Sequence, residues 1–182
     1  GNNMSIINGI QNPQNFYISG NSWTNTPPAG YSYYNLWSAN NTTIDFNDNA
    51  VVKTIYDPCP VGFKMPASNA FTGFTSDGLN QSTAANINAD GTADSPGIKF
   101  STNYGHNFWT NSSKNKTIFF PASGLRRFGD GSLDNVGRGG WYWSAVPYIS
   151  GFGCNLVLFW DVAEPRQYES CSWGFAARPV SE

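Results

Sequence analysis

Charge is scarce in this chain of 182 residues: Asp, Glu, Lys and Arg make up 12% of it, and the formal net charge is −2. Soluble proteins on average carry about 25% charged residues. The ten basic residues are scattered, and only Arg126 and Arg127 are adjacent. Because binding to a phosphate backbone needs a clustered basic surface, this pattern argues against nucleic acid as a partner.

Residue types that carry most enzyme and metal chemistry are also rare. The chain has one His, His106, and three Glu. It has no Gly-x-Ser-x-Gly motif to supply a nucleophile, and no Cys or His lies at ligand spacing from another. Two acidic turns, residues 88–94 and 130–135, carry oxygen ligands that calcium accepts, but Asp-Gly is also an ordinary turn signal. We expect no enzyme, no cofactor and no metal site.

Long hydrophobic runs are missing as well. No wholly apolar stretch exceeds a few residues, so we expect no transmembrane segment in this chain. The three cysteines are compatible with one disulfide and one free thiol in an oxidising compartment.

Neutral polar and aromatic residues take the place of charge. The chain contains 22 Asn, 19 Ser and 12 Thr, and aromatic residues make up 16% of it. This profile is typical of extracellular β-rich domains, and it is too aromatic for a disordered chain. The density of Gly, Pro and Asn, without long stretches of helical period, predicts one α+β domain over residues 1–182. We expect short, mostly antiparallel strands, one or two short helices and long loops.

Local patterns place some of these elements. Residues 51–56 are rich in β-branched side chains and predict a strand, and Ser68 is suited to cap a helix of two turns. Further strands are expected over residues 97–102, 107–111, 117–121, 140–145 and 154–161, and in pieces over 168–180.

The last predicted hairpin brings two cysteines together. If its turn is centred on Val162 and Ala163, Cys154 lies directly opposite Cys171. Antiparallel cross-strand neighbours are about 4.5–5.5 Å apart, within reach of a disulfide. A shift of one residue would remove the pairing. Cys59, between two prolines, is then a buried free thiol.

The loop before and into residue 141 combines the groups that bind sugars: cationic forks, carboxylates, amides and an aromatic ring. The candidate ligand-binding residues are Arg126, Arg127, Asp130, Asp134, Asn135, Arg138 and Trp141. Most tryptophans in a small β-rich domain lie in the core, so a core role for Trp141 stays open.

Five motifs in combination resemble a known family. They are residues 55–66 (containing Asp57-Pro58-Cys59-Pro60), 69–74, 118–124, 142–145 and the closing segment 174–180. Together they are similar to the carboxy-terminal module of fimbrillin-family surface lipoproteins from Bacteroidetes and, more distantly, to the Fibrobacter major paralogous domain. The resemblance covers residues 51–180 and is loose over residues 1–50.

This resemblance implies a C-type-lectin-like fold, and a full-length protein that is exported, lipid-anchored in the outer membrane and placed at a pilus. Two departures matter. Pro179 stands where distant relatives carry a cysteine, so Cys59 lacks that partner. The calcium-dependent lectin triplet appears only as Glu164-Pro165-Arg166, and Arg does not coordinate calcium. We therefore expect a cell-surface adhesion module whose partner is a host or microbial glycan or protein. The alternative is a structural pilus subunit that contacts only neighbouring subunits.

Overall fold

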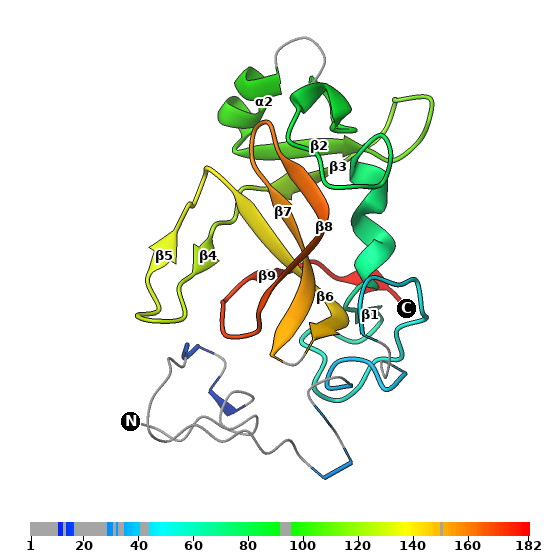
Figure 1. Cartoon of the computed structure of the whole chain (residues 1–182), viewed down its shortest axis with the longest axis vertical. Coiled ribbons are helices and arrows are strands. Elements are labelled where there is room, and N and C mark those ends of the chain that lie inside the picture. The colour runs from blue at the N-terminus through cyan, green and yellow to red at the C-terminus, as the bar shows by residue number, and fades with distance from the viewer. Residues whose placement is uncertain are drawn as a thin grey trace.

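A four-stranded sheet forms the centre of the molecule in the computed structural model (Figure 1), which describes residues 11–12, 14–16, 29–30, 32, 35–40, 44–91, 96–149 and 151–182. Its strands are β6 (Gly140–Ile149), β7 (Phe152–Leu158), β8 (Ala163–Ser170) and β9 (Ala176–Ala177), in the order β8-β7-β6-β9. The pair β6–β9 is parallel, and the pairs β6–β7 and β7–β8 are antiparallel. Residues 140–147 of β6 are all buried, as expected for a strand covered on both faces.

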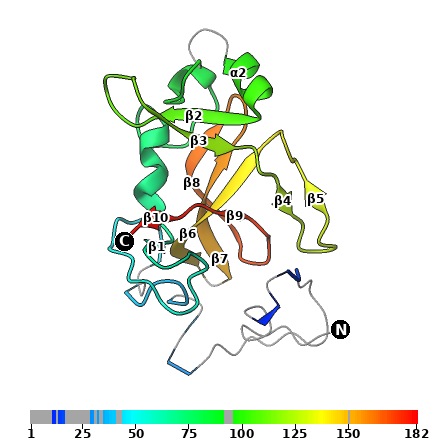
Figure 2. The ribbon, with the colours of Figure 1, turned by 180° about the vertical axis from the view of Figure 1, so that it is seen from behind.

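Three two-stranded sheets surround this centre, and all are antiparallel. They pair β1 (Phe63–Lys64) with β10 (Val180–Ser181), β2 (Gly105–Trp109) with β3 (Thr117–Pro121), and β4 (Leu125–Arg126) with β5 (Leu133–Asp134). Figure 2, the view from behind, shows β2–β3 packed across one end of the central sheet and β4–β5 standing out to one side.

Three short helices lie in the described part of the chain, one more than the sequence suggested. They are the 3-10 helices η1 (Ser68–Phe74) and η2 (Ala84–Asn86) and the α-helix α2 (Pro96–Asn103). The prediction that Ser68 caps η1 is wrong, because Ala67 holds the cap position and makes no side-chain cap bond. The Ser68 hydroxyl instead bonds to the backbone of Asn47, accepting from its N–H at 2.9 Å and donating to its carbonyl at 3.1 Å.

Two predicted strands are not found. Residues 97–102 lie inside α2, whose first residue is Pro96; proline suits this position because its missing N–H has no helical partner there. Residues 51–56 form only a single antiparallel bridge between Lys53 and Ser38. The α+β class with mostly short strands is nevertheless confirmed.

The core fills both faces of the central sheet. On one face, Phe71 of η1 packs with Leu156 and Leu158 of β7, and with Phe108 and Phe120 of the β2–β3 pair. On the other face lie Trp141, Trp143 and Val157, covered by the segment that carries Trp173 and Phe175. The Trp143 and Phe175 rings stack at 4.4 Å. Because successive side chains along β6 and β7 point to opposite faces of the sheet, each one packs in one of two separate aromatic clusters.

Candidate functional site

The β4–β5 hairpin carries most of the predicted ligand-binding residues and holds them on a firm backbone. Arg127 N donates to Ser132 O at 2.9 Å, and Gly131 N donates to Arg127 O at 2.9 Å. Asp130 Oδ1 accepts from Ser132 Oγ at 2.7 Å and from Ser132 N at 2.9 Å, and these two bonds lower the pKa of Asp130. The Asp130 carboxylate thus forms its hydrogen bonds within the acidic turn 130–135.

The structure brings six of the seven predicted residues to the surface of this hairpin. Arg126, Arg127, Asp130, Asp134 and Arg138 are exposed, and Asn135 is half-buried. Within the described residues, the ion pairs are Lys53–Asp57 and Lys99–Asp90, so no carboxylate there lies within ion-pair distance of Arg127 or Arg138. Among the described residues, neither guanidinium group has an ion-pair partner, and the charge of Arg127 contributes to the lowered pKa of Asp130.

Trp141 is the seventh residue, and the structure places it in the core rather than at the surface with the other six. Its side chain is 8% exposed and packs edge-to-face against Phe159, with ring centroids 5.2 Å apart. Trp141 pairs with Val157 in the centre of the sheet, and the Phe175 ring lies 6.2 Å away on the same face. Its position in a strand covered on both faces, rather than in the preceding loop, places it in the core.

An open hollow of about 320 Å³ lies between the hairpin and the segment before β9. Its walls are apolar in the main, from Leu125, Leu133, Phe175 and Phe16, and Arg126 and Gly174 form one edge. Beside it, Phe128 is 45% exposed and packs edge-to-face on Trp173. Leu133 and Phe128 were not among the ligand-binding residues predicted from the sequence. An apolar residue within a polar turn was the signal available in the sequence. The structure shows that Leu133 is 62% exposed, as in a contact surface.

The other acidic turn and His106 have structural roles. Both Asp90 carboxylate oxygens lie 3.0 Å from Lys99 Nζ, whereas Asp94 lies outside the described residues. His106 is buried, its Nε2 is 2.8 Å from Phe159 O, and burial lowers its pKa. Among the residues that the structure describes, no three His, Cys, Asp or Glu side chains are placed to hold a metal ion.

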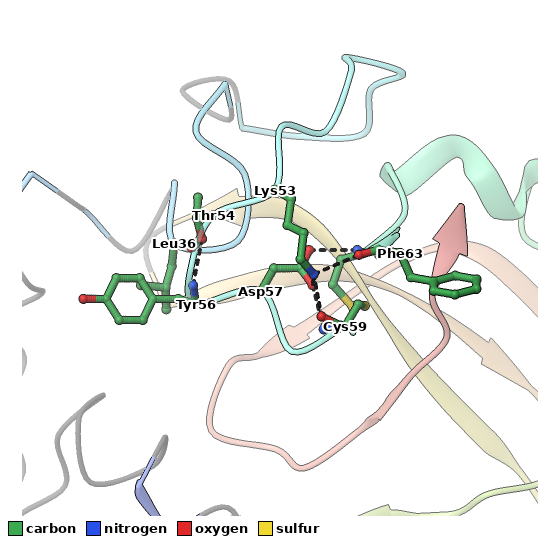
Figure 3. Close-up of polar contacts among 8 residues, drawn as sticks. Leu36, Lys53, Thr54, Tyr56, Asp57, Cys59 and Phe63 are labelled. Atoms are coloured by element: carbon green, nitrogen blue, oxygen red, sulfur yellow. Dashed lines mark hydrogen bonds and ion pairs between the residues drawn. The ribbon is translucent and has the colours of Figure 1, made fainter. Parts of the chain in front are cut away.

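Asp57 organises the Pro-Cys-Pro turn (Figure 3). Its Oδ1 accepts from Cys59 N at 2.7 Å, and its Oδ2 accepts from Met65 N at 2.9 Å. Lys53 Nζ lies 3.1 Å from Asp57 Oδ1 and also donates to the carbonyl oxygens of Cys59 and Phe63. Three backbone segments therefore meet at one carboxylate and one ammonium group.

The electrostatics of this turn exclude a reactive thiol. Burial alone would raise the pKa of Asp57, but the bonds from Met65, Cys59 and Lys53 outweigh it and lower that pKa. Burial, followed by the neighbouring Asp57 carboxylate, raises the pKa of Cys59 to about 12. Because the thiolate is the nucleophile, Cys59 is inert at neutral pH.

The predicted Cys154–Cys171 disulfide is absent, and all three cysteines are free thiols. The turn spans residues 159–162, and a bulge follows Asn155, so Cys154 lies opposite Tyr168 rather than Cys171. A Cβ atom at Gly153 would lie 3.7 Å from Cys171 Sγ, which places Cys171 on the Gly153 face of the sheet. Cys154, the next residue, points to the opposite face.

Comparison with protein-family models, with curated proteins and with solved structures finds no match to this chain. The described part of the chain contains no helix with both the length and the apolar character that crossing a bilayer requires.

Proposed function

We propose that this chain is a ligand-binding, adhesive module of a cell-surface protein, and that the hairpin surface binds glycan. The observation that carries the proposal is an open, largely apolar hollow edged by Arg126, beside a hairpin and following loop that expose Arg127, Asp134 and Arg138. Sugars offer hydroxyl groups to such charged side chains and apolar ring faces to aromatic or aliphatic walls. The inert Cys59 and the structural His106 favour binding over catalysis.

The wider setting of the proposal rests on the sequence motifs. Residues 55–66, 118–124 and 174–180 resemble the carboxy-terminal module of fimbrillin-family lipoproteins. From that likeness we propose a C-type-lectin-like fold, export, an outer-membrane lipid anchor on the full-length protein and a position at a pilus. Low charge and high aromatic content support an extracellular setting.

A glycan array probed with the purified domain tests the proposal. Arg127→Ala and Asp134→Ala should each weaken retention on a glycan that the parent binds. Their stability should change by no more than about 0.5 kcal/mol, since both side chains are exposed. Lys116→Ala is the matched control, because it removes one exposed charge from the β2–β3 loop. Binding by both hairpin variants at the parent level would exclude the hairpin as the site.

A structural pilus subunit is the second candidate, and a different surface favours it. Around the β1–β10 pair, Val61 is 96% exposed, and Phe63 and Val180 also have large exposed fractions. Apolar exposure of this kind marks protein contacts. If the array retains nothing while Val61→Ser abolishes assembly with neighbouring subunits, the subunit function replaces the adhesive one.

A further inference from the structure

The Phe16 ring rests against a firm edge of the hollow. A Cβ atom at residue 174 would lie 2.6 Å from Phe16 Cε2, so the ring occupies space that only Gly174 leaves open. Arg126 Cζ lies 6.0 Å from the centroid of the same ring, at the outer limit of a cation–π contact. Arg126 and Gly174 donate to each other's carbonyls at 2.8 and 3.0 Å, so this edge keeps its shape whether or not the ring is present.

Among the residues that the structure describes, the contacts that tie residues 14–16 to the hollow are those of the Phe16 ring. Within the described part of the chain, the backbone hydrogen bond of these residues runs from Asn15 N to Asn12 O at 3.0 Å, inside the same segment. No hydrogen bond or ion pair of residues 14–16 reaches the hollow in that part. A segment docked through one side chain separates from its site at low free-energy cost, because few contacts must break together.

We infer that the Phe16 ring, which lines the hollow, is a displaceable, built-in occupant of its Arg126–Gly174 edge. Its aromatic ring fills the position next to Arg126 and Gly174 that the ring of a ligand would take, and release of residues 14–16 opens the full site. The inference rests on the proposed function, because it assigns the regulation of that same site. A site that is open a tenth of the time binds its ligand about tenfold more weakly than a fully open one.

The test uses Phe16→Ala and a small aromatic probe, N-acetyl-phenylalanine amide, followed by amide chemical shifts in NMR. We expect the probe to give saturable shifts at Arg126, Leu133 and Gly174 in the variant, with at least about tenfold weaker binding to the parent. Phe16→Leu should fall between the two, since it keeps apolar volume without the ring. Trp160→Ala is the control, because it removes an aromatic side chain that is 49% exposed at the remote β7–β8 turn, and it should match the parent.

Equal binding of the probe by the parent and the Phe16→Ala variant, or no binding to either, would overturn the inference. Because the probe is not a sugar, its result is independent of the glycan array. If the array retains no glycan but the probe binds Phe16→Ala, the glycan proposal is refuted and the inference about Phe16 stands. Where the array does identify a glycan, Phe16→Ala should bind it about tenfold more tightly, and unchanged affinity would contradict the occupant while sparing the glycan site.

Discussion

Asn80 pairs with Arg166 through its side-chain amide in the way that a neighbouring strand would. Arg166 N donates to Asn80 Oδ1 at 2.9 Å, and Asn80 Nδ2 donates to Arg166 O at 3.0 Å. Gln81 adds two backbone bonds to Ala163 alongside. Because β8 lies at the edge of the central sheet, these contacts close part of an edge that is otherwise a template for intermolecular pairing.

Removal of this amide should loosen the edge. Asn80→Ala loses both bonds to Arg166, and we expect about 1 kcal/mol of destabilisation, faster hydrogen exchange at the Arg166 amide and more self-association at high concentration. Asn80→Asp keeps the acceptor for the Arg166 N–H and loses only the donor, so it should retain the protection of that amide. Identical exchange in the two variants would show that the amide does not cover the edge.

Asp57 should be the most costly single charge to remove. Asp57→Asn turns a two-oxygen acceptor into a group with one acceptor and one donor, which leaves either Cys59 N or Met65 N without a partner. It also leaves the Lys53 ammonium without its counter-ion. We expect a loss of about 2–4 kcal/mol in denaturant unfolding. The exposed Asp48→Asn is the control and should stay within about 0.5 kcal/mol of the parent.

The same carboxylate predicts acid sensitivity. Since the folded pKa of Asp57 is lowered from 3.8, its stabilisation is fully present above that pH and is lost as the pH falls through the folded value. From pH 5 downwards, the free energy of unfolding should therefore fall more steeply for the parent than for Asp57→Asn. Parallel curves would contradict the lowered pKa.

His106 predicts a second pH dependence at milder acidity. Burial lowers its folded pKa below the usual 6.5, so on acidification the unfolded chain takes up a proton before the folded one does. Stability should be full above pH 6.5 and should fall below it, by at most about 1.4 kcal/mol per pH unit. The chain has one histidine, so unfolding curves between pH 5 and 8 report this group cleanly. His106→Gln, which retains a donor toward Phe159 O, should flatten the dependence.

The cysteines should differ in reactivity. Cys171 is exposed, whereas Cys59 and Cys154 are buried. Burial raises the pKa of all three thiols, and it raises those of Cys59 and Cys154 to about 12. A maleimide should add once to the native protein, at Cys171, and three times after denaturation. Peptide mapping without reduction should find no link between Cys154 and Cys171, and finding one would mean that the β7–β8 register differs from the structure.

Much of the β-rich core could be predicted from local pattern. The apolar runs that form β3, β6 and β7 are too short for helices, so a strand is the main structure that they favour. The register of β7–β8 could not be predicted, because the bulge after Asn155 shifts the pairing and no residue type marks it. Residues 97–102 suit a strand or a helix equally by pattern, and Pro96 at the helix start was the deciding signal.

The candidate site also has a part that could be predicted from the sequence and a part that could not. The exposed charges of the β4–β5 hairpin could be inferred from composition, because a polar, Gly-rich turn tends to reach solvent. Trp141 could not be separated from them, since its neighbours in sequence belong to the loop while its neighbours in space are Val157, Phe159 and Phe175. The hollow depends on Phe16 and Gly174, which are distant in sequence, so only the three-dimensional arrangement reveals it.

Lys53 has a consequence for which substitutions this position tolerates. Its single nitrogen meets Asp57 Oδ1, Cys59 O and Phe63 O, which matches the three protons of an ammonium group one to one. Arginine keeps the charge but spreads its donors over a flat fork, so it cannot direct three protons from one point at three separate acceptors. Position 53 thus requires the geometry of an ammonium group as well as a positive charge. Lys53→Arg, which is usually regarded as conservative, is a severe substitution here.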